Sequence, residues 1–303
     1  MTKMKKFTEK IVQFIDRPIV IPSPLNILPD LLFIKLRYLR KTRKRLNLKN
    51  PVLYDEKLQW HKLYNRQPHY PGLVDKYEVR NYVIKTIGEK YLIPNYGVWN
   101  SFDEIPFDEL PEQFVLKCTH DCGSVRIIKD KNSADMKKKR KFFRRRLAYN
   151  WYWHGREWVY KDIKPRIIAE KFMVDESGDD LKDYKIFCFN GEPKVIAVYF
   201  NRRTKEKGRN CYTPQWEYLP FSSKFKTNPN FIIEKPSCLE EMLELARKLS
   251  ADKIQVRVDL YVINEKIYFG ELTFHNASGF SRFDPPEWNK TFGDWMVLPE
   301  VVN

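Results

Sequence analysis

The feature that most constrains the fold is a pair of strand-like runs joined by Asn190-Gly191. Residues 183–189 (DYKIFCF) and 194–200 (KVIAVYF) are rich in β-branched and aromatic side chains. Asn-Gly favours the left-handed backbone of a two-residue hairpin turn, so the segment predicts an antiparallel hairpin. Residues 255–263 and 267–274 form a second such pair, joined most simply by a three-residue turn at 264–266.

Further strands alternate with helical segments. Strands are expected at 113–118 and 125–129, on either side of a loop that contains Gly123, and at 166–172. Helices are expected over most of residues 1–70, at 76–87, at 134–150, and from a capping box at Ser237 and Glu240 to about 249. This mixture predicts an α+β fold rather than a doubly wound parallel sheet, and no dinucleotide-binding or Walker A glycine motif is present.

The charge of the chain points to an acidic partner. The 303 residues carry a formal net charge of +16. The densest basic run, residues 137–146, is either a solvated helix face or a site for a polyanion. No helix-turn-helix, zinc-finger or RNP pattern indicates a specific nucleic acid. Residues 19–36 are apolar and a basic stretch follows them, which fits either a packed N-terminal helix or contact with an anionic membrane surface.

Targeting signals and cysteines favour a cytoplasmic protein. Residues 1–17 contain charged and polar side chains within any apolar run, so we expect no secretory signal peptide. The five cysteines are scattered and form no zinc-site spacing, so reduced thiols are expected.

Asp259 and Glu271 are the first candidate site. With a three-residue turn, Ile263 pairs with Ile267 and Asp259 lies opposite Glu271, at a Cα separation of at most about 5.5 Å. A two-residue turn would place the two acids on opposite faces. Facing carboxylates are typical of a Mg²⁺ site that also uses substrate phosphates. The alternative is that Arg257, two residues before Asp259, neutralises both acids in a structural network.

Two other segments are typical of nucleotide binding. Lys117 lies on a strand before the loop with Gly123 and Ser124, where a lysine and backbone N–H groups could hold phosphate oxygens. Residues 169–173 form an apolar strand with one acid, Glu170. Either its backbone C=O groups or the Glu170 side chain could accept a hydrogen bond from the adenine amino group, with Phe172 and Met173 packed against the ring.

In this order, the segments resemble the TupA-like ATP-grasp family of cell-surface polysaccharide gene clusters, named for teichuronopeptide biosynthesis. The resemblance runs from about Asn50 to the C-terminus. It rests on the motifs NPVLYDEKLQWHKLY, VDKYEVRNYV, YLIPNYG, LPEQFVLKCTHDCGS, IIAEKFM, DYKIFCFNGEP and RVDLY…GELTFHNASGF. It implies an ATP-grasp fold with two α+β lobes that grip the nucleotide. The implied regions are a helical N-terminal region (1–74), a central subdomain (75–169) and a C-terminal subdomain (170–303).

The resemblance also implies roles for individual residues, with ATP and Mg²⁺ as cofactors. Lys117 would hold the α- and β-phosphates under a flap formed by Gly123 and Ser124. Asp183 would bind the ribose. Arg202 or Arg203 would contact the γ-phosphate, Lys185 would reach phosphate or substrate, and Arg257 would steady the reacting carboxyl group. The adenine hinge would be Glu170, Lys171, Phe172 and Met173.

The metal ligands implied by the resemblance are Asp259 and Glu271, with a third ligand left open. The wider superfamily has Asn two residues after the glutamate, but this chain has Thr273 there. Either Asn276 takes that role through a locally altered turn, or Thr273 and water complete the shell.

The implied reaction joins an amine to a carboxylate through an acyl phosphate. By family analogy the carboxylate belongs to a uronic acid of a surface polysaccharide or its precursor, and the amine to an amino acid. A capsular glycosyltransferase is an alternative, although no Asp-x-Asp motif lies between strands. A non-catalytic binder of anionic polymers or membranes is another.

Overall fold

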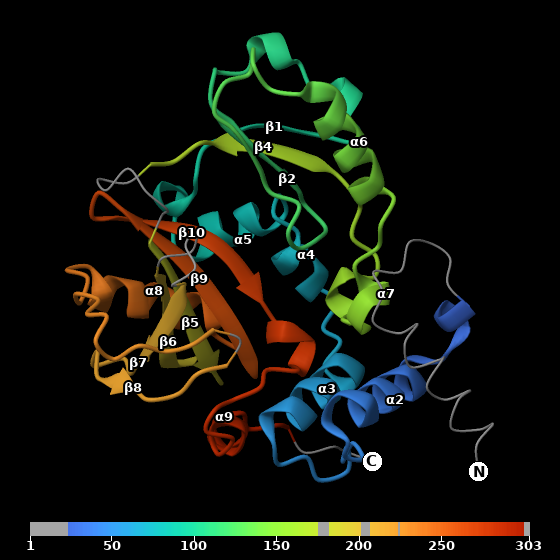
Figure 1. Ribbon diagram of the computed structural model, residues 1–303, viewed down its shortest axis with the longest axis vertical. Helices are drawn as coiled ribbons and strands as arrows, with labels where there is room; N and C mark the ends of the chain where they lie inside the picture. The colour runs from blue at the N-terminus through green and yellow to red at the C-terminus, as the bar shows by residue number, and fades with distance from the viewer. Residues whose placement is uncertain (1–23, 175–181, 201–206, 224, 300–303) are drawn as a thin grey trace.

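The computed structural model describes residues 24–174, 182–200, 207–223 and 225–299, and shows two antiparallel sheets with helices around them (Figure 1). Sheet A, of four strands, lies at the top of Figure 1, and sheet B, of six strands, lies below it. Within the described residues, no helix is both long and apolar enough to cross a bilayer.

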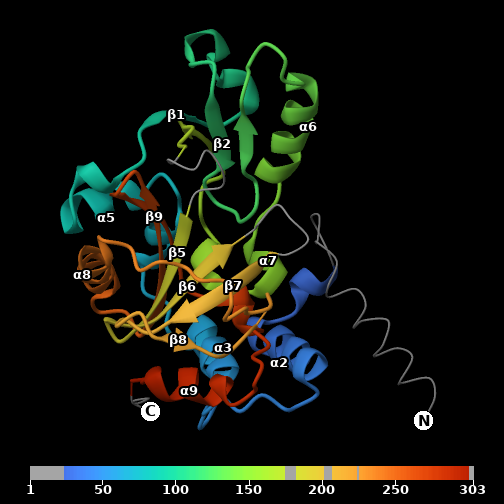
Figure 2. The same ribbon diagram turned by 60° about the vertical axis from the view of Figure 1, so that its left-hand side comes forward.

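Sheet A has the strand order β1-β4-β2-β3. The helix α6 (Met136–Leu147) lies beside it (Figure 2). The Phe143 side chain of this helix is buried in a core that includes Phe114 and Leu116. The exposed face of α6 carries its basic side chains, so one face of this helix is core and the other is solvated. The strands are β1 (Asn95–Trp99), β2 (Phe114–Cys118), β3 (Arg126–Ile128) and β4 (Ile167–Lys171).

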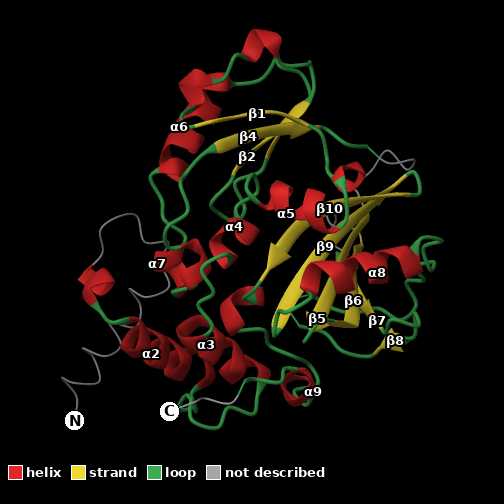
Figure 3. Ribbon diagram, turned by 180° about the vertical axis from the view of Figure 1, so that it is seen from behind, coloured by secondary structure: helices red, strands yellow, loops and turns green. Residues whose placement is uncertain are grey.

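Sheet B has the strand order β10-β9-β5-β6-β7-β8. One face is apolar and is covered by α8 (Leu239–Ser250), with α5 (Val79–Thr86) beside it (Figure 3). The strands are β5 (Lys182–Phe189), β6 (Glu192–Phe200), β7 (Gly208–Tyr212), β8 (Tyr218–Leu219), β9 (Gln255–Ile263) and β10 (Lys266–Thr273).

The opposite face of sheet B is divided into an apolar half and a polar half. Phe187 and Ala197 pack against α3 (Tyr54–Tyr64) and α9 (Trp288–Trp295). Further along the strands the same face carries charged side chains, because residues two apart in a strand share a face. Lys185 on β5 pairs with Asp259 on β9, so the charged half of the face is continuous across neighbouring strands.

Polar contacts join the N-terminal helices to each other and to Tyr152 of the body. On α2 (Asp30–Thr42), Asp30 forms an ion pair with Arg66 at 2.7 Å, and its other carboxylate oxygen accepts a hydrogen bond from Tyr152. Tyr38 donates to Asp55 at 3.2 Å. The described part of the N-terminal region is therefore helical, as the sequence predicts, and includes the short helix α4 (Tyr70–Val74).

The hairpin predicted at Asn190-Gly191 is confirmed, with β5 and β6 antiparallel and φ angles of +49° and +83° at the turn. The capping box predicted at Ser237 is wrong, because α8 begins at Leu239 and has no side-chain cap. The division into three regions stays a prediction. Its second boundary, between residues 169 and 170, falls inside β4.

Candidate active site

Asp259 and Glu271 lie opposite each other on β9 and β10, as predicted, but the predicted turn is wrong. The turn has two residues, Asn264 and Glu265, with φ angles of +48° and +61°. That register alone would put the two acids on opposite faces. A β-bulge at Gly270 adds one residue to β10 and shifts the pairing by one, which brings Glu271 opposite Asp259.

Arg257 lies between the two carboxylates. Its Nε donates to Asp259 Oδ1 at 2.6 Å and its Nη2 to Asp259 Oδ2 at 2.7 Å, a bidentate pair. The same Nη2 donates to Glu271 Oε1 at 2.9 Å. Nη1 donates to Asn276 Oδ1 at 2.7 Å. One guanidinium group thus contacts all three predicted metal ligands.

Lys185 is held between two further carboxylates. Its Nζ forms an ion pair with Asp183 at 2.9 Å and another with Asp259. Asp183, predicted to bind ribose, is buried, so in this structure its carboxylate serves the ion-pair network. Within the described residues, Asp183, Asp259 and Glu271 thus gather around Lys185 and Arg257.

The pKa shifts follow from this arrangement. Burial raises the pKa of Asp259, but the positive charges of Arg257 and Lys185 outweigh it and hold the pKa below its usual value. Burial lowers the pKa of Lys185, and the Asp259 and Asp183 carboxylates more than offset this. The ionised forms are therefore stable at neutral pH.

The oxygen donors at this position fit Mg²⁺. The Glu271 side chain is 40% exposed and lies opposite the buried Asp259 carboxylate. Among the described residues no three His, Cys, Asp or Glu side chains gather as a metal cluster. Mg²⁺ needs only one or two carboxylates when substrate phosphates complete its shell, so a Mg²⁺ site at this pair stays a prediction. Asn276 contacts Arg257, and Thr273 Oγ1 donates to Glu271 Oε1 at 3.2 Å, so the third ligand stays open.

Lys117 and Glu170 face each other in sheet A. The pairing of Val115 on β2 with Glu170 on β4 places Lys117 diagonally across from the acid on the same face. Their side chains form an ion pair at 2.5 Å, with both groups largely buried. The two residues predicted to contact phosphate and adenine are thus adjacent, and each is paired with the other.

The loop predicted as a flap is ordered by its own side chains. Ser124 Oγ donates to Asp121 Oδ1 at 2.5 Å and accepts from the backbone N–H of Cys118 at 2.8 Å. Asp121 also forms an ion pair with Arg146 at 2.5 Å. Gly123 has φ +84° and nothing within 4 Å of where a Cβ would lie, so it provides a turn at an open position. In this structure the Ser124 hydroxyl stabilises the loop.

The loop and the end of β10 both act on Tyr160. Burial, followed by the charges of Glu157, Glu271 and Cys122, raises the pKa of Tyr160. Cys122 belongs to the loop between β2 and β3, and Glu271 belongs to β10, so both segments contribute negative charge at this tyrosine.

The predicted adenine hinge begins with the last two residues of β4 and continues beyond the strand. Lys171 is exposed, Phe172 and Met173 are half-buried, and the backbone N–H of Lys171 donates to Pro94 O at 2.9 Å. Lys171 and Met173 line a cavity of about 430 Å³ that also contacts Tyr268 on β10. The hinge therefore borders a space between sheet A and the edge of sheet B. Arg202, and the alternative Arg203, lie outside the described residues.

The sequence analysis missed a buried polar network that fixes the short segment η6 (Asn276–Gly279). Lys62 on α3 donates to Ser278 O at 2.8 Å, Ser278 Oγ at 2.9 Å and Gly155 O at 3.1 Å. His61 and His275 make a contact of 3.1 Å between ring nitrogens. A lysine in a helix carries no sequence signal for burial, because its acceptors are distant in the chain.

The chain is similar to solved structures at low sequence identity. For D-alanine-D-alanine ligase from Helicobacter pylori, identity is 17% and the TM-score 0.39 over 75% of this chain and 61% of the ligase. For an ATP-grasp RimK domain protein from Sphaerobacter thermophilus, identity is 12% and the TM-score 0.39 over 82% of this chain and 72% of that protein. For N5-carboxyaminoimidazole synthetase from Staphylococcus aureus, identity is 13% and the TM-score 0.40 over 75% of this chain and 52% of the synthetase. The chain thus spans less than two thirds of the first of these proteins and about half of the third. No curated protein matches the sequence.

The sequence pattern of one family, described as TupA-like ATPgrasp, matches residues 56–297. This range contains both sheets and every site residue predicted above. The structure has helices around two antiparallel sheets, which agrees with the α+β fold predicted from the sequence. The chain therefore belongs to the TupA-like ATP-grasp family.

Proposed function

We propose that the protein is an ATP-dependent carboxylate–amine ligase. The observation that supports this best is the pair Asp259 and Glu271, placed opposite each other by a bulge, with Arg257 bonded to both. A structural ion pair needs one acid for one arginine. Arg257 holds two carboxylates at once, and two carboxylates that face each other suit a divalent cation.

In the proposed reaction a substrate carboxylate oxygen attacks the γ-phosphorus of ATP. The bond from the γ-phosphorus to the ADP oxygen breaks, and an acyl phosphate forms. An amine nitrogen then attacks the acyl carbon, forms the amide, and releases phosphate and a proton. The chemistry requires mainly positioning and charge stabilisation. Mg²⁺, held by Asp259 and Glu271, would supply positive charge to the phosphate oxygens.

The chain's own residues would divide these tasks. Arg257 would orient the reacting carboxylate, and Lys185 would stabilise the transferred phosphoryl group, with Arg202 as a further candidate. Lys117 would break its ion pair with Glu170 and bind the α- and β-phosphates. Glu170 and the rest of the hinge would then bind adenine. The loop with Gly123 would close over the phosphates and keep water from the acyl phosphate.

The finer part of the proposal concerns the substrates and their place in the cell. By family analogy, the carboxylate belongs to a uronic acid of a capsular or other surface polysaccharide, or of its precursor, and the amine belongs to an amino acid. The net charge of +16 supports an acidic substrate. The reaction would take place in the cytoplasm, at the inner face of the membrane where such precursors are assembled.

Phosphate release from ATP tests the proposal, measured across a panel of uronic acids and amino acids with mass detection of the conjugate. We expect ADP, phosphate and an amide product, and loss of all three in Lys117→Met and Glu271→Gln. Glu244→Gln on the exposed face of α8 is the control for loss of an acidic side chain. Transfer of sugar from a UDP-sugar without ATP consumption would refute the ligase proposal in favour of a glycosyltransferase.

A further inference from the structure

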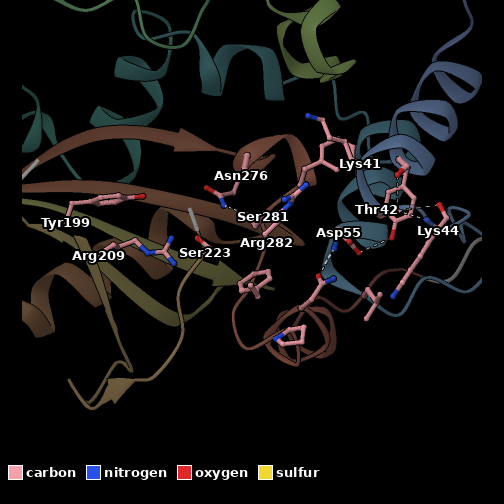
Figure 4. Close-up of a pocket in the computed structure, with 17 residues that line it drawn as sticks. Lys41, Thr42, Lys44, Asp55, Tyr199, Arg209, Ser223, Asn276, Ser281 and Arg282 are labelled. Atoms are coloured by element: carbon pink, nitrogen blue, oxygen red, sulfur yellow. Dashed lines mark hydrogen bonds between the residues drawn. The ribbon is translucent and has the colours of Figure 1, made fainter. Parts of the chain in front are cut away.

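A cavity of about 740 Å³ lies between the N-terminal helices, η6 and sheet B (Figure 4). Its volume is in the range of small-molecule sites. Figure 4 shows Arg209 and Tyr199 on the sheet side and Lys41, Thr42 and Asp55 on the helical side. The sequence analysis assigned no role to these side chains.

Arg209 is the unusual member of the cavity wall. It is 4% exposed and lies on β7, every residue of which is buried. Within the part of the chain that the structure describes, no carboxylate forms an ion pair with it, and its Nε has no hydrogen-bond partner. Its guanidinium lies 5.7 Å from the ring centroid of Phe221. A buried charge without a counter-ion is unfavourable, so an anionic ligand would supply what the protein does not.

The rest of the wall suits an anionic sugar. Four basic side chains and one acid, Asp55, line the cavity, a formal surplus of three positive charges. Asp55 already accepts hydrogen bonds from Tyr38 and from the backbone N–H of Glu56. Aromatic rings offer faces for sugar rings, and hydroxyl and amide groups offer hydrogen bonds. The basic residues are Lys41, Lys44, Arg209 and Arg282; the aromatic residues are Tyr38, Tyr199, Phe280 and Phe283.

The cavity joins the active site at Asn276, which lines the cavity and accepts a hydrogen bond from Arg257. Arg209 and Arg257 lie on strands that are not neighbours. Asp259 pairs with Lys185 on β5, which pairs with Ala197 on β6, so β7 is three strand spacings from β9, about 14 Å. A ligand with two anionic groups can therefore pair with an arginine from each strand.

We propose that this cavity binds the carboxylate-bearing substrate as a sugar with a second anionic group, which pairs with Arg209 while the reacting carboxylate lies near Arg257. The proposal rests on the ligase function proposed above. The second anion has two sources with the same chemistry: another uronate in a glycan chain, or a phosphate of an activated sugar precursor.

Calorimetric titration without ATP tests the proposal and separates the two sources. The probes are glucuronate, a trimer of hexuronate, UDP-glucuronate and a neutral trisaccharide. We expect the trimer or UDP-glucuronate to bind at least about tenfold more tightly than glucuronate, and Arg209→Met to remove most of that gain. Because no carboxylate of the described residues pairs with Arg209, Arg209→Met should melt at or above the wild-type temperature. Arg282→Gln, at an exposed position on the wall, is a second variant that should weaken the same ligands.

Lys137→Gln combined with Arg144→Gln, both exposed on α6, is the control for charge alone and should bind all probes as the wild type does. Equal binding of glucuronate and both larger probes, unchanged binding in Arg209→Met and Arg282→Gln, or an equal loss in the α6 variant would overturn the proposal. If no sugar binds while Mg²⁺-ATP does, this inference fails and the ligase proposal survives. If Mg²⁺-ATP does not bind, the ligase proposal itself fails.

Discussion

Asp259 and Glu271 should differ sharply in their contribution to stability, although both belong to the proposed metal site. Asp259 is 2% exposed and accepts bonds from Arg257 and Lys185. The Glu271 side chain is 40% exposed and accepts one bond from Arg257 and one from the Thr273 hydroxyl. We therefore compare Asp259→Asn with Glu271→Gln, two isosteric changes that each remove one negative charge.

The magnitude follows from the partners that are left unpaired. An Asn at 259 keeps one acceptor oxygen but loses the bidentate pair with Arg257 and the charge that compensates Lys185. Breaking a buried ion pair on one side costs about 3–5 kcal/mol, and the retained oxygen reduces this to about 3 kcal/mol. An exposed pair contributes at most about 1 kcal/mol, so Glu271→Gln should stay below that value.

Urea denaturation at pH 7 measures both free energies of unfolding, and a pH series adds a second test. The pKa of Asp259 is lower in the folded than in the unfolded chain, so its stabilisation is complete above pH about 4 and is lost as pH falls through the folded pKa. Asp259→Asn should therefore lose less stability on acidification than the wild type. Equal denaturation midpoints for the two variants, or unchanged acid sensitivity in Asp259→Asn, would refute this reasoning.

Two further predictions concern the buried Lys62 of α3 and the contact of α9 with the residues before α3. Burial lowers the pKa of Lys62 to about 7, so between pH 7 and 10 the unfolded chain binds a proton there that the folded chain does not. The free energy of unfolding should rise over this range by at most about 1.4 kcal/mol per pH unit, and Lys62→Met should flatten the rise; an unchanged slope in denaturation curves would contradict it. A Cβ on Gly293 would lie 2.2 Å from Val52 O, so Gly293→Ala should cost about 2–3 kcal/mol in thermal or urea unfolding. Gly72→Ala, with nothing within 4 Å in helix α4, is the control and should be neutral or slightly stabilising.

The local elements could be predicted because their signals are short-range. Asn190-Gly191 specified its hairpin through the backbone freedom of two residues, and Gly88, at φ +108°, follows α5 as a predicted helix stop. The capping box at Ser237 failed because a spacing of two residue types does not fix where the first helical turn begins.

The Asp259–Glu271 pairing was correct although its premise was wrong. Asn264 and Glu265 both adopt positive φ, which their residue types do not demand, so the two-residue turn has no strong signal in the sequence. Gly270 inside a strand is a signal for a bulge, and the predicted register did not include one. The predicted turn was one residue too long and the bulge was missing, and these two errors cancel in the pairing of Asp259 with Glu271.

The rest of the site depends on contacts between distant segments. Ser278 lies 216 residues from Lys62, and no periodic pattern joins them. Arg209 lies in a short strand whose sequence does not reveal that both faces are covered or that a cavity adjoins its guanidinium. Such features follow from packing, which sequence patterns describe only for apolar side chains.

Because of the bulge at Gly270, the register of the last hairpin depends on the summed length of the turn and of β10, and not on either length alone. One residue added to the turn at Asn264-Glu265 and one removed at Gly270 would cancel, and leave Asp259 opposite Glu271. Either change alone would turn Glu271 away from its partner and bring Leu272 out of the core. Insertions and deletions at these two places should therefore act as suppressors of each other.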